Sequence, residues 1–329
     1  METSNTGQSD AAAKPKCPLC GSGDTLFETK IGIDLIVQSY WKEQRELVKH
    51  DLKGTPWIEV YRCRRCSLVF FDPELPGSPE FYAGFQSFDW YYLEDKAEYE
   101  MAIKWMPPGA RVLEVGCGVG WFGKKLTSAQ YTGLEYSHTA AEKARASGLD
   151  VRTESIEGHA QACPAAYQVV CSFQVLEHVS GPGAFIASCI ECLEPGGLLI
   201  FAVPSEDSYL KFVQNGFLNL PPHHLTHWPD KTLEAIAGIF PVSLVAIEHE
   251  VVADCHLQAY VSTMISRRLN AILGRPKTVI DHSITAKLLN KFASVTGGWM
   301  SKMFDDAVFL PRGHTVLATY RKDGALDRE

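Results

Sequence analysis

The segment from Arg111 to Gly123 reads RVLEVGCGVGWFG, a short apolar run followed by closely spaced glycines. The apolar run is typical of a buried strand, and the residues after the glycines are typical of the first turn of a helix. Glycines let the backbone approach a ligand closely, and a helix that starts directly afterwards offers unpaired N–H groups to that ligand. The segment therefore predicts a strand, a ligand-binding turn and a helix in direct succession.

The chain beyond Arg111 continues this alternation of strands and helices. Strands are expected near residues 111–115, 131–135, 150–153, 167–172, 197–203, 243–250 and 314–321. Helices are expected near residues 120–128, 138–147, 181–193 and 230–239, and a helical insert is expected at about 256–305, before the last strand. Such alternation predicts an α/β fold with a parallel sheet covered by helices on both faces.

The order of residues in the glycine-rich turn points to one family. Gly118-Val-Gly120-Trp-Phe-Gly123 matches G-x-G-x-x-G, the fingerprint of dinucleotide-binding folds. A dinucleotide loop opens at its first glycine, whereas here Glu114 and Gly116 already stand at the strand end and give E-x-G-x-G-x-G. That pattern resembles motif I of class I S-adenosylmethionine-dependent methyltransferases. The resemblance implies a Rossmann-like seven-stranded sheet, and it leaves an NAD-dependent oxidoreductase as the alternative.

Four later segments resemble the same family in the same order. They are TGLEYS from Thr132, TESIEGHA from Thr153, YQVVCSFQVLEHV from Tyr167 and LEPGGLLIFAVP from Leu193. The resemblance covers roughly residues 105–250 and the last strand. The ESIEGHA and LEHV stretches are most similar to ubiquinone-biosynthesis O-methyltransferases and their small-molecule-modifying relatives.

The resemblance implies where S-adenosylmethionine binds. Glu135, at the end of the second strand, would accept hydrogen bonds from the ribose hydroxyls. Phe173 and Gln174 would flank the adenosine or the methionine portion. The full set of expected donor-binding residues is Glu114, Gly116, Cys117, Gly118, Gly120, Glu135, Tyr136, Ser155, Ile156, Phe173 and Gln174.

Two C-x-x-C pairs near the N-terminus offer four thiolates. Cys17 and Cys20 form the first pair, and Cys63 and Cys66 form the second. Structural zinc takes four such ligands, so we expect a zinc-ribbon-like module, with four unliganded thiols or a redox pair as the alternatives. The gap between the pairs is long for a ribbon, so residues 21–62 must carry strands or a helix of their own. The remaining cysteines are expected to pack in the core as small apolar side chains: Cys117, Cys163, Cys171, Cys189, Cys192 and Cys255.

A histidine-rich loop, LPPHHLTHWP from Leu220, follows the fifth strand. Open α/β sheets bind ligands beyond the carboxyl ends of their strands, so this loop should face the transferred methyl group. HHLTHW resembles the HEHLSYF-like motif of sugar C-methyltransferases, which also carry an N-terminal zinc-binding domain. His224 falls on the second histidine of that motif, while His223 stands where the motif has glutamate. The catalytic candidates are His224, as the base, with His223 and His178.

Two alternatives stay open for these histidines: they shape the pocket only, or they bind a metal. The expected reaction is methyl transfer to a small molecule, at a hydroxyl or an acidic carbon. The sugar C-methyltransferase likeness implies a sugar or glycan precursor, and the quinone likeness implies a phenolic compound. A non-catalytic zinc-ribbon adaptor is the alternative outside the enzymes.

Charge and composition limit the kinds of partner that the protein is expected to bind. The chain has 31 basic and 39 acidic residues and a net charge of −8, which disfavours a general nucleic-acid binder. The N-terminus lacks the apolar core of a secretory signal, so the expected location is cytoplasmic. Helices at 256–305 are basic and amphipathic, a pattern of peripheral membrane contact, but ordinary packing on the domain or on a second subunit is the favoured interpretation. The expected organisation is a disordered tail at 1–16, the zinc module at 17–75 and the methyltransferase domain at 81–329.

Overall fold

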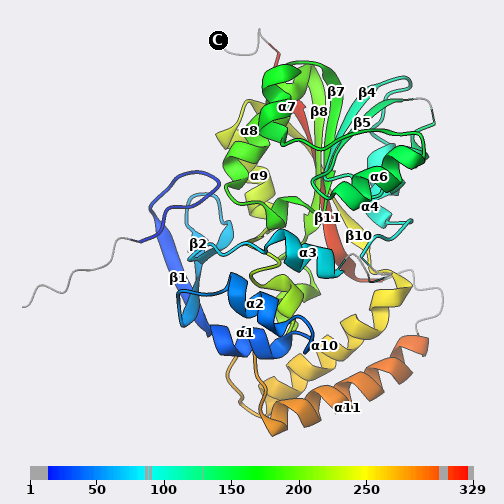
Figure 1. The fold of residues 1–329 in the computed structure, drawn as a ribbon. Coiled ribbons are helices and arrows are strands. Elements are labelled where there is room, and N and C mark those ends of the chain that lie inside the picture. Colours follow the sequence, from blue (N-terminus) through cyan, green and yellow to red (C-terminus); the bar gives the residue numbers. More distant parts are fainter. Residues whose placement is uncertain (1–13, 86–87, 89–90, 128, 304–309, 325–329) are drawn as a thin grey trace, which may run out of the picture.

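A computed structural model describes residues 14–85, 88, 91–127, 129–303 and 310–324. Most of the expected disordered tail, residues 1–13, lies outside the described residues. The described chain forms a large sheet covered by helices, a smaller sheet beside its lower end, and a helical hairpin (Figure 1). None of its helices is long and apolar enough to cross a membrane.

The large sheet has seven strands in the order β10-β11-β8-β7-β4-β5-β6. Pairing is parallel from β8 through β6, and β11 runs antiparallel to both of its neighbours. The strands are β4 (Arg111–Val115), β5 (Gln130–Leu134), β6 (Asp150–Arg152), β7 (Tyr167–Phe173), β8 (Leu193–Pro204), β10 (Val242–Val251) and β11 (Arg312–Lys322). The predicted α/β fold with a seven-stranded Rossmann-like sheet is therefore confirmed.

Helices cover both faces of this sheet, as the alternation predicts. Adjacent strand residues point to opposite faces, so Val112 packs with one helical layer and Leu113 with the other. The first face holds α4 (Ala97–Ile103) and α5 (Trp121–Lys125). The second holds α7 (Ile156–Ala162), α8 (Pro182–Cys192) and α9 (Asp230–Ile239), while α6 (His138–Ala146) packs near β6.

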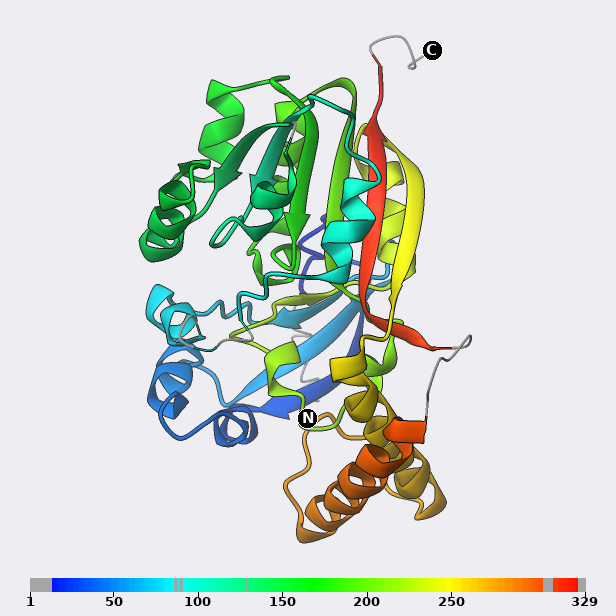
Figure 2. The same cartoon turned by 90° about the vertical axis from the view of Figure 1, so that its right-hand side faces the viewer.

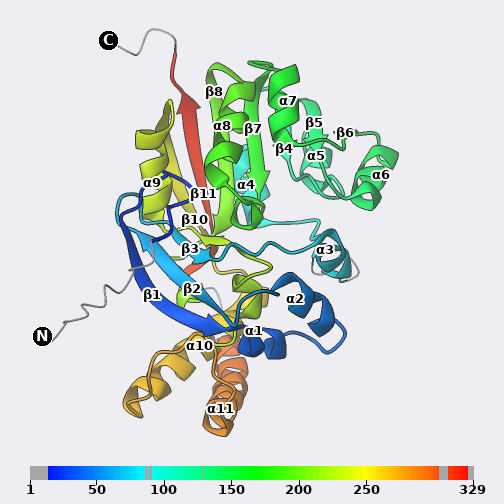
Figure 3. The same cartoon turned by 60° about the vertical axis from the view of Figure 1, so that its left-hand side comes forward.

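The smaller sheet contains the N-terminal strands and one short strand from far along the chain. Its order is β1-β2-β3-β9, and all pairs are antiparallel (Figure 3). The bounds are β1 (Thr25–Gly32), β2 (Trp57–Cys63), β3 (Val69–Asp72) and β9 (Thr226–His227), with α1 (Ile33–Ser39) and α2 (Arg45–Asp51) between β1 and β2. The long gap between the cysteine pairs thus carries strands and helices, as expected. Because β9 belongs to the histidine loop, the N-terminal module and that loop share one sheet.

Residues 81–106 are rich in aromatic side chains and are expected to be helical from the sequence, but they do not form a single helix. This segment overlaps α3 (Pro79–Phe85) and contains α4, with non-helical chain before Ala97. The division has a physical reason, because Tyr92 between the two helices lies against Gly118 of the glycine loop, which a continuous helix would not allow.

The helical insert forms a hairpin of α10 (Asp254–Ile272) and α11 (Ile284–Met300), followed by the short η4 (Ser301–Met303). It leaves the large sheet after β10 and projects from the body of the molecule, with α10 between α11 and the rest of the chain (Figure 2). Cys255, in the first turn of α10, is exposed. Its expected place in the core was wrong, because the start of this helix lies at the surface, whereas Cys189 and Cys192 are buried as expected.

Candidate functional site

The glycine loop lies at the carboxyl end of β4 in a conformation that only glycine adopts easily. Gly116, Gly118 and Gly120 all have positive φ, at 80°, 54° and 80°. A Cβ on Gly116 would meet a methyl of Val175 at 2.4 Å, and a Cβ on Gly120 would meet Leu149 at 2.4 Å. Both the backbone angles and the space therefore require glycine at these positions.

Glu135, directly after β5, holds this loop through its carboxylate. One oxygen accepts a hydrogen bond from the Gly118 N–H at 2.8 Å, and the other accepts from the Ser137 N–H at 2.7 Å. Burial raises the pKa of Glu135, while these two backbone donors favour its charged form. The side chain thus stands beside the loop at the edge of the sheet, where the family resemblance expects the ribose contact.

Glu114 lies below the loop instead of lining it. It is 2% exposed and accepts a hydrogen bond from the Tyr131 hydroxyl. Burial raises its pKa to about 8. In this structure the carboxyl of Glu114 is therefore buried beneath the turn, where the Tyr131 hydroxyl holds it.

The other expected donor-binding residues have differing positions. Ser155 caps α7, where its hydroxyl accepts from the Gly158 N–H, and Ile156 is buried behind it. Tyr136 is 72% exposed at the rim. Cys117 is buried in the loop.

Phe173 and Gln174, at the end of β7, are engaged by other side chains of the described chain. Phe173 is buried between the rings of Tyr99 and Phe122, in the core below the sheet edge. The Gln174 amide donates towards Glu98 at 3.4 Å and Thr315 at 3.3 Å. Phe173 thus packs among core rings and Gln174 faces Glu98 and β11, and the expectation that these side chains flank the donor stays a prediction.

The histidine loop and the LEH segment meet at the same edge of the sheet. His178, in η1 (Leu176–His178), lies with its ring centre 4.6 Å from that of His223 and 4.8 Å from that of His224. The rings of His223 and His224 stack at 4.7 Å. One ligating atom from each of the three lies within 4.8 Å of the others. The three catalytic candidates are therefore neighbours in space.

The Nδ1 atom of each of these rings is fixed by an oxygen atom. His178 Nδ1 faces the His223 carbonyl, His223 Nδ1 lies 2.8 Å from the Leu218 carbonyl, and His224 Nδ1 lies 2.9 Å from the Asn219 amide oxygen. Carbonyl oxygens only accept, so Nδ1 must donate and Nε2 carries the lone pair. We name these three residues the histidine triad; its Nε2 atoms can accept a proton or bind a cation.

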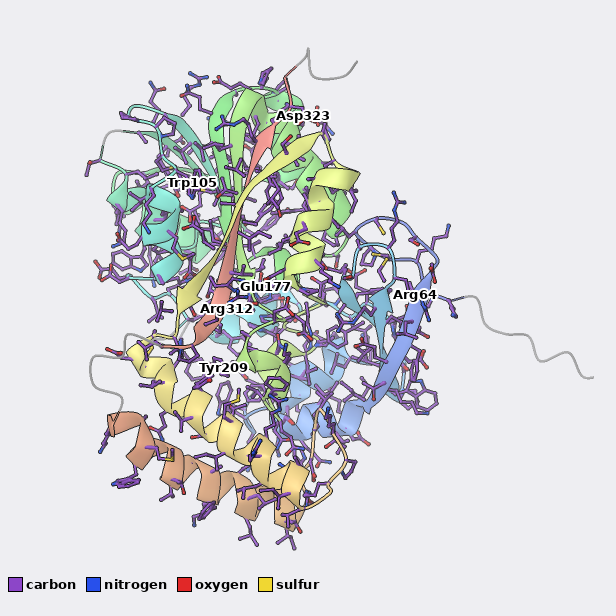
Figure 4. All side chains as sticks on the ribbon, turned by 180° about the vertical axis from the view of Figure 1, so that it is seen from behind. Arg64, Trp105, Glu177, Tyr209, Arg312 and Asp323 are labelled. Carbon is purple, nitrogen blue, oxygen red and sulfur yellow. The ribbon has the colours of Figure 1, made fainter. Side chains whose placement is uncertain are left out.

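Burial keeps the histidine triad neutral. It lowers the pKa of His178 to about 4 and of His223 to about 3, and the pKa of His224 also lies well below its usual value. Glu177, beside the triad, shows the opposite shift for the same reason: burial raises its pKa to about 8. Its Oε2 has no hydrogen-bond partner among the described residues. Glu177 lies where the large sheet meets the lower part of the molecule (Figure 4).

His227 stands apart from the triad. Its Nδ1 lies 3.2 Å from Glu206, and its Nε2 lies 2.8 Å from the Asn219 carbonyl. Both ring nitrogens are thus engaged, and the residue forms part of β9. Because β9 pairs with β3, His227 helps to attach the histidine loop to β3.

The four cysteines of the two C-x-x-C pairs converge. Cys17 Sγ lies 3.6 Å from Cys66 Sγ, and Cys20 Sγ lies 3.6 Å from Cys63 Sγ. All four sulfur atoms lie within 4.8 Å of one another. The two turns are alike. The residue after each pair, Gly21 or Ser67, has positive φ, and its N–H donates to the backbone carbonyl of the first cysteine of the pair. The arrangement has the donor set and the spacing of a tetrahedral thiolate site.

Comparison with known proteins identifies the family. A family model described as a methyltransferase domain matches residues 82–239. Ubiquinone biosynthesis O-methyltransferase from Vibrio cholerae is 30% identical over 167 residues, which cover 47% of this chain and 68% of that protein. The chain belongs to the S-adenosylmethionine-dependent methyltransferases. The corresponding protein from Pectobacterium carotovorum subsp. carotovorum is 32% identical over 148 residues, covering 38% of this methyltransferase and 62% of its own length.

Solved structures of more distant proteins also resemble this methyltransferase. A SAM-dependent methyltransferase from Archaeoglobus fulgidus is 14% identical with a TM-score of 0.47, covering 74% of this chain and all of that one. The [4+2]-cyclase SpnF is 17% identical with a TM-score of 0.44, covering 69% and 81%. Membership of the family follows from the sequence relatives.

Several side chains of the methyltransferase site could not be found from the sequence. Tyr92 lies over Gly118, with its ring 2.8 Å from where a Cβ would stand, and it comes from a segment without a motif. Asn219 fixes the tautomer of His224, but a single asparagine before a loop is no signal by itself. Glu177, the acid of the LEH segment, is indicated by the sequence itself.

Proposed function

We propose that this methyltransferase methylates a hydroxyl oxygen or an acidic carbon of a small ring-bearing acceptor, either a sugar or glycan precursor or a phenolic compound. The histidine triad carries this proposal, because it gathers neutral imidazoles around η1, which directly follows Val175, whose side chain lies against Gly116 of the glycine loop. Aromatic rings surround the triad: Phe85 lies 5.2 Å from His223 between ring centres, and Tyr82 lies 5.7 Å from His178. Aromatic surfaces of this kind suit the faces of a planar or sugar ring.

The donor is expected to lie on the glycine loop. The positive φ angles of Gly116, Gly118 and Gly120 shape the loop whose backbone N–H groups would contact the donor, and the two carboxylate oxygens of Glu135 are the proposed acceptors for its ribose hydroxyls. When bound, S-adenosylmethionine supplies a methyl group on a sulfonium, and the acceptor oxygen or carbon displaces the sulfur from that methyl group. The chain's part is to hold the two partners in line, which by itself lowers the barrier substantially.

His224 is the proposed base. Its Nδ1–H is held by the Asn219 amide oxygen, so Nε2 presents its lone pair. The acceptor's O–H or C–H proton passes to Nε2 as the new bond to carbon forms and the sulfonium bond breaks. Burial keeps His224 uncharged near neutral pH, the form that can take a proton. His223 and His178 hold the ring in place from either side.

The test of this assignment is a methyl-transfer assay with labelled donor, against a panel of sugar nucleotides and phenols. We expect His224→Ala to lower kcat by a factor on the order of 10²–10⁴, with donor affinity nearly unchanged. His227→Ala should have a smaller effect, because its ring nitrogens face Glu206 and the Asn219 carbonyl and are not presented to the acceptor. The His224→Ala variant should also lose the acidic limb of the pH–rate profile.

Two results would overturn the assignment of His224 as the base. An unchanged pH–rate profile in His224→Ala would exclude it, and Glu177 would become the candidate. The spacing of the triad also allows a shared divalent cation. A rate that is lost with a chelator and restored by added metal, in protein that keeps its thiolate-bound metal, would therefore make the triad a cation site.

We further propose that Cys17, Cys20, Cys63 and Cys66 bind one structural zinc ion. With Zn–S bonds of about 2.3 Å, the edge of a sulfur tetrahedron is about 3.8 Å. The two measured Sγ–Sγ distances are 3.6 Å, so the thiols need little movement to bind the ion. Zinc would supply cross-linking only, since all four ligands come from the protein and leave no open position.

A further inference from the structure

One face of α11 carries a row of large apolar side chains that the described chain does not cover. Its members are all 58–78% exposed. They recur at intervals of three and four residues, which places them on one side of the helix. We name this row the apolar stripe; it consists of Ile284, Leu288, Phe292, Val295 and Trp299.

The opposite side of α11 makes its contact with the molecule. Ala286, Ala293 and Gly297 are buried there, and a Cβ on Gly297 would meet the Ser262 hydroxyl of α10 at 2.3 Å. At about 100° per residue, these small residues lie across the helix axis from the apolar stripe. The stripe is therefore not needed for packing α11 onto α10. At the tip of the hairpin, Ile272 and Leu273 add further exposed apolar surface, at 72% and 57%.

The hairpin is strongly basic in an acidic chain. α11 contains no aspartate or glutamate, and α10 contains only Asp254, at its first position. The acid of the connecting loop, Asp281, is paired with Arg275 at 2.7 Å. Against these stand the basic residues Arg267, Arg268, Arg275, Lys277, Lys287, Lys291 and Lys302, while the whole chain has a net charge of −8.

We propose that α11 lies on an anionic lipid surface, with the apolar stripe in the acyl boundary and Lys287 and Lys291 at the headgroups. A helix with one apolar face, flanking lysines and aromatic residues suits this interface. A second copy of the chain is a less suitable partner for the apolar stripe. Two stripes packed together would bring lysines near lysines with no acid on either α11 to pair with them, and like charges at such flanks oppose association.

The hairpin is fixed to the acceptor side of the enzyme, so binding to a surface would orient the site. Asn215 makes three hydrogen bonds to the connecting loop: its N–H donates to the Val279 carbonyl at 2.9 Å, its Oδ1 accepts from the Asp281 N–H at 2.8 Å, and its Nδ2 donates to the Asp281 carbonyl at 3.1 Å. His282 Nε2 lies 3.0 Å from the Ser39 hydroxyl. Asn215 belongs to the segment that leads directly into the histidine loop. A lipid-bound enzyme would thus hold the triad at a fixed height above the surface.

The experiment is flotation of the full-length protein with vesicles of phosphatidylcholine alone or mixed with phosphatidylglycerol, at low and high salt. We expect binding to the anionic vesicles only, weakened by salt. Leu288→Glu with Phe292→Glu should abolish binding, and circular dichroism should be unchanged because both side chains are exposed. Lys287→Glu with Lys291→Glu, which keeps the stripe, should lower binding by about fivefold or more for each lysine.

A matched control and a second readout make the outcome decisive. Lys42→Glu with Lys49→Glu changes two exposed lysines of the N-terminal module by the same charge and should bind like the unaltered protein. Trp299 should give a blue-shifted emission on binding that Trp299→Phe lacks. Absence of binding to anionic vesicles would overturn the proposal. So would a dimer by light scattering that the Leu288→Glu, Phe292→Glu variant converts to a monomer, since the stripe would then be a subunit interface.

Discussion

Two carboxyl groups of this methyltransferase, the half-buried Glu135 and the buried Glu177, differ in what surrounds them. Glu135 is held by two backbone N–H groups, whereas Glu177 has an oxygen without any partner among the described residues. The first arrangement suits an ionised acceptor of hydrogen bonds, and the second favours a neutral acid. The sequence indicated Glu135 through its place after the second strand. It could not indicate the state of Glu177, which depends on burial by distant segments.

Glu135→Ala should weaken the binding of S-adenosylmethionine by roughly 1–3 kcal/mol, the cost of leaving hydrogen-bonding groups unpaired. The Gly118 N–H would lose its acceptor as well, so the loop itself should loosen. Calorimetric titration measures the change. Glu142→Ala on the exposed side of α6 is the control and should bind the donor normally. Equal affinities in the two variants would remove Glu135 from the donor site.

The pKa of Glu177 gives the stability of the fold a dependence on pH. The folded protein keeps this proton up to about pH 8, while the unfolded chain releases it near the ordinary value of 4.5. The folded state therefore binds more protons between these values, and the free energy of unfolding falls as the pH rises through that window. Glu177→Gln, always neutral, should reduce this fall when denaturant unfolding is compared at both ends of the window. Glu234→Gln, an exposed acid on α9, should leave it as it was.

At the scale of elements, the large sheet was predictable and the connections around it were not. Each strand from β4 to β8 lies within a few positions of its expected place, and β4 and β7 are the short apolar runs that are easiest to recognise. α9 was expected at the residues where it lies. The aromatic segment at 81–106 was expected to be helical, but residues 91–96 within it are not. Tyr92 is placed by contact with the loop, which no local pattern encodes.

Cys63→Ser should lower the zinc content and the free energy of unfolding together, because a structural metal contributes its binding energy to folding. Elemental analysis and denaturant unfolding of the purified protein measure the two effects. Cys255→Ser, at an exposed position, is the control for loss of a thiol. Full retention of zinc by the Cys17→Ser, Cys63→Ser double variant would show that the metal is not held by these pairs.

At the scale of the whole molecule, the arrangement of the N-terminal module could not be read from the sequence. The two C-x-x-C pairs indicated a separate small unit, and the cysteines do converge. However, its sheet is completed by β9, a strand of two residues with no periodicity to detect. Tertiary contact alone decides this pairing, as it decides the meeting of His178 with the histidine loop.

Donor binding should stabilise the whole fold, since the glycine loop leads from β4 into α5 and is hydrogen-bonded to the end of β5. At a concentration one hundred times its Kd, a ligand that binds only the folded state adds about 2.7 kcal/mol to the free energy of unfolding. We expect S-adenosylmethionine to produce this gain in a thermal or denaturant melt. NAD and NADH are the comparison and should produce none. A gain with the nicotinamide cofactors alone would favour an oxidoreductase use of the loop.

The pairing of Val69 with His227 and of Phe70 with Thr226 has a consequence for synthesis of the chain. The N-terminal segment leaves the ribosome first, and domains begin to fold in that order. The outer edge of β3 cannot receive its partner until the histidine loop has also emerged, more than 150 residues later by the numbering of the paired positions. Until then an apolar strand edge is open to other chains, the kind of edge that promotes aggregation. Early binding of metal by the two cysteine pairs would hold that edge in place while the rest of the enzyme is made.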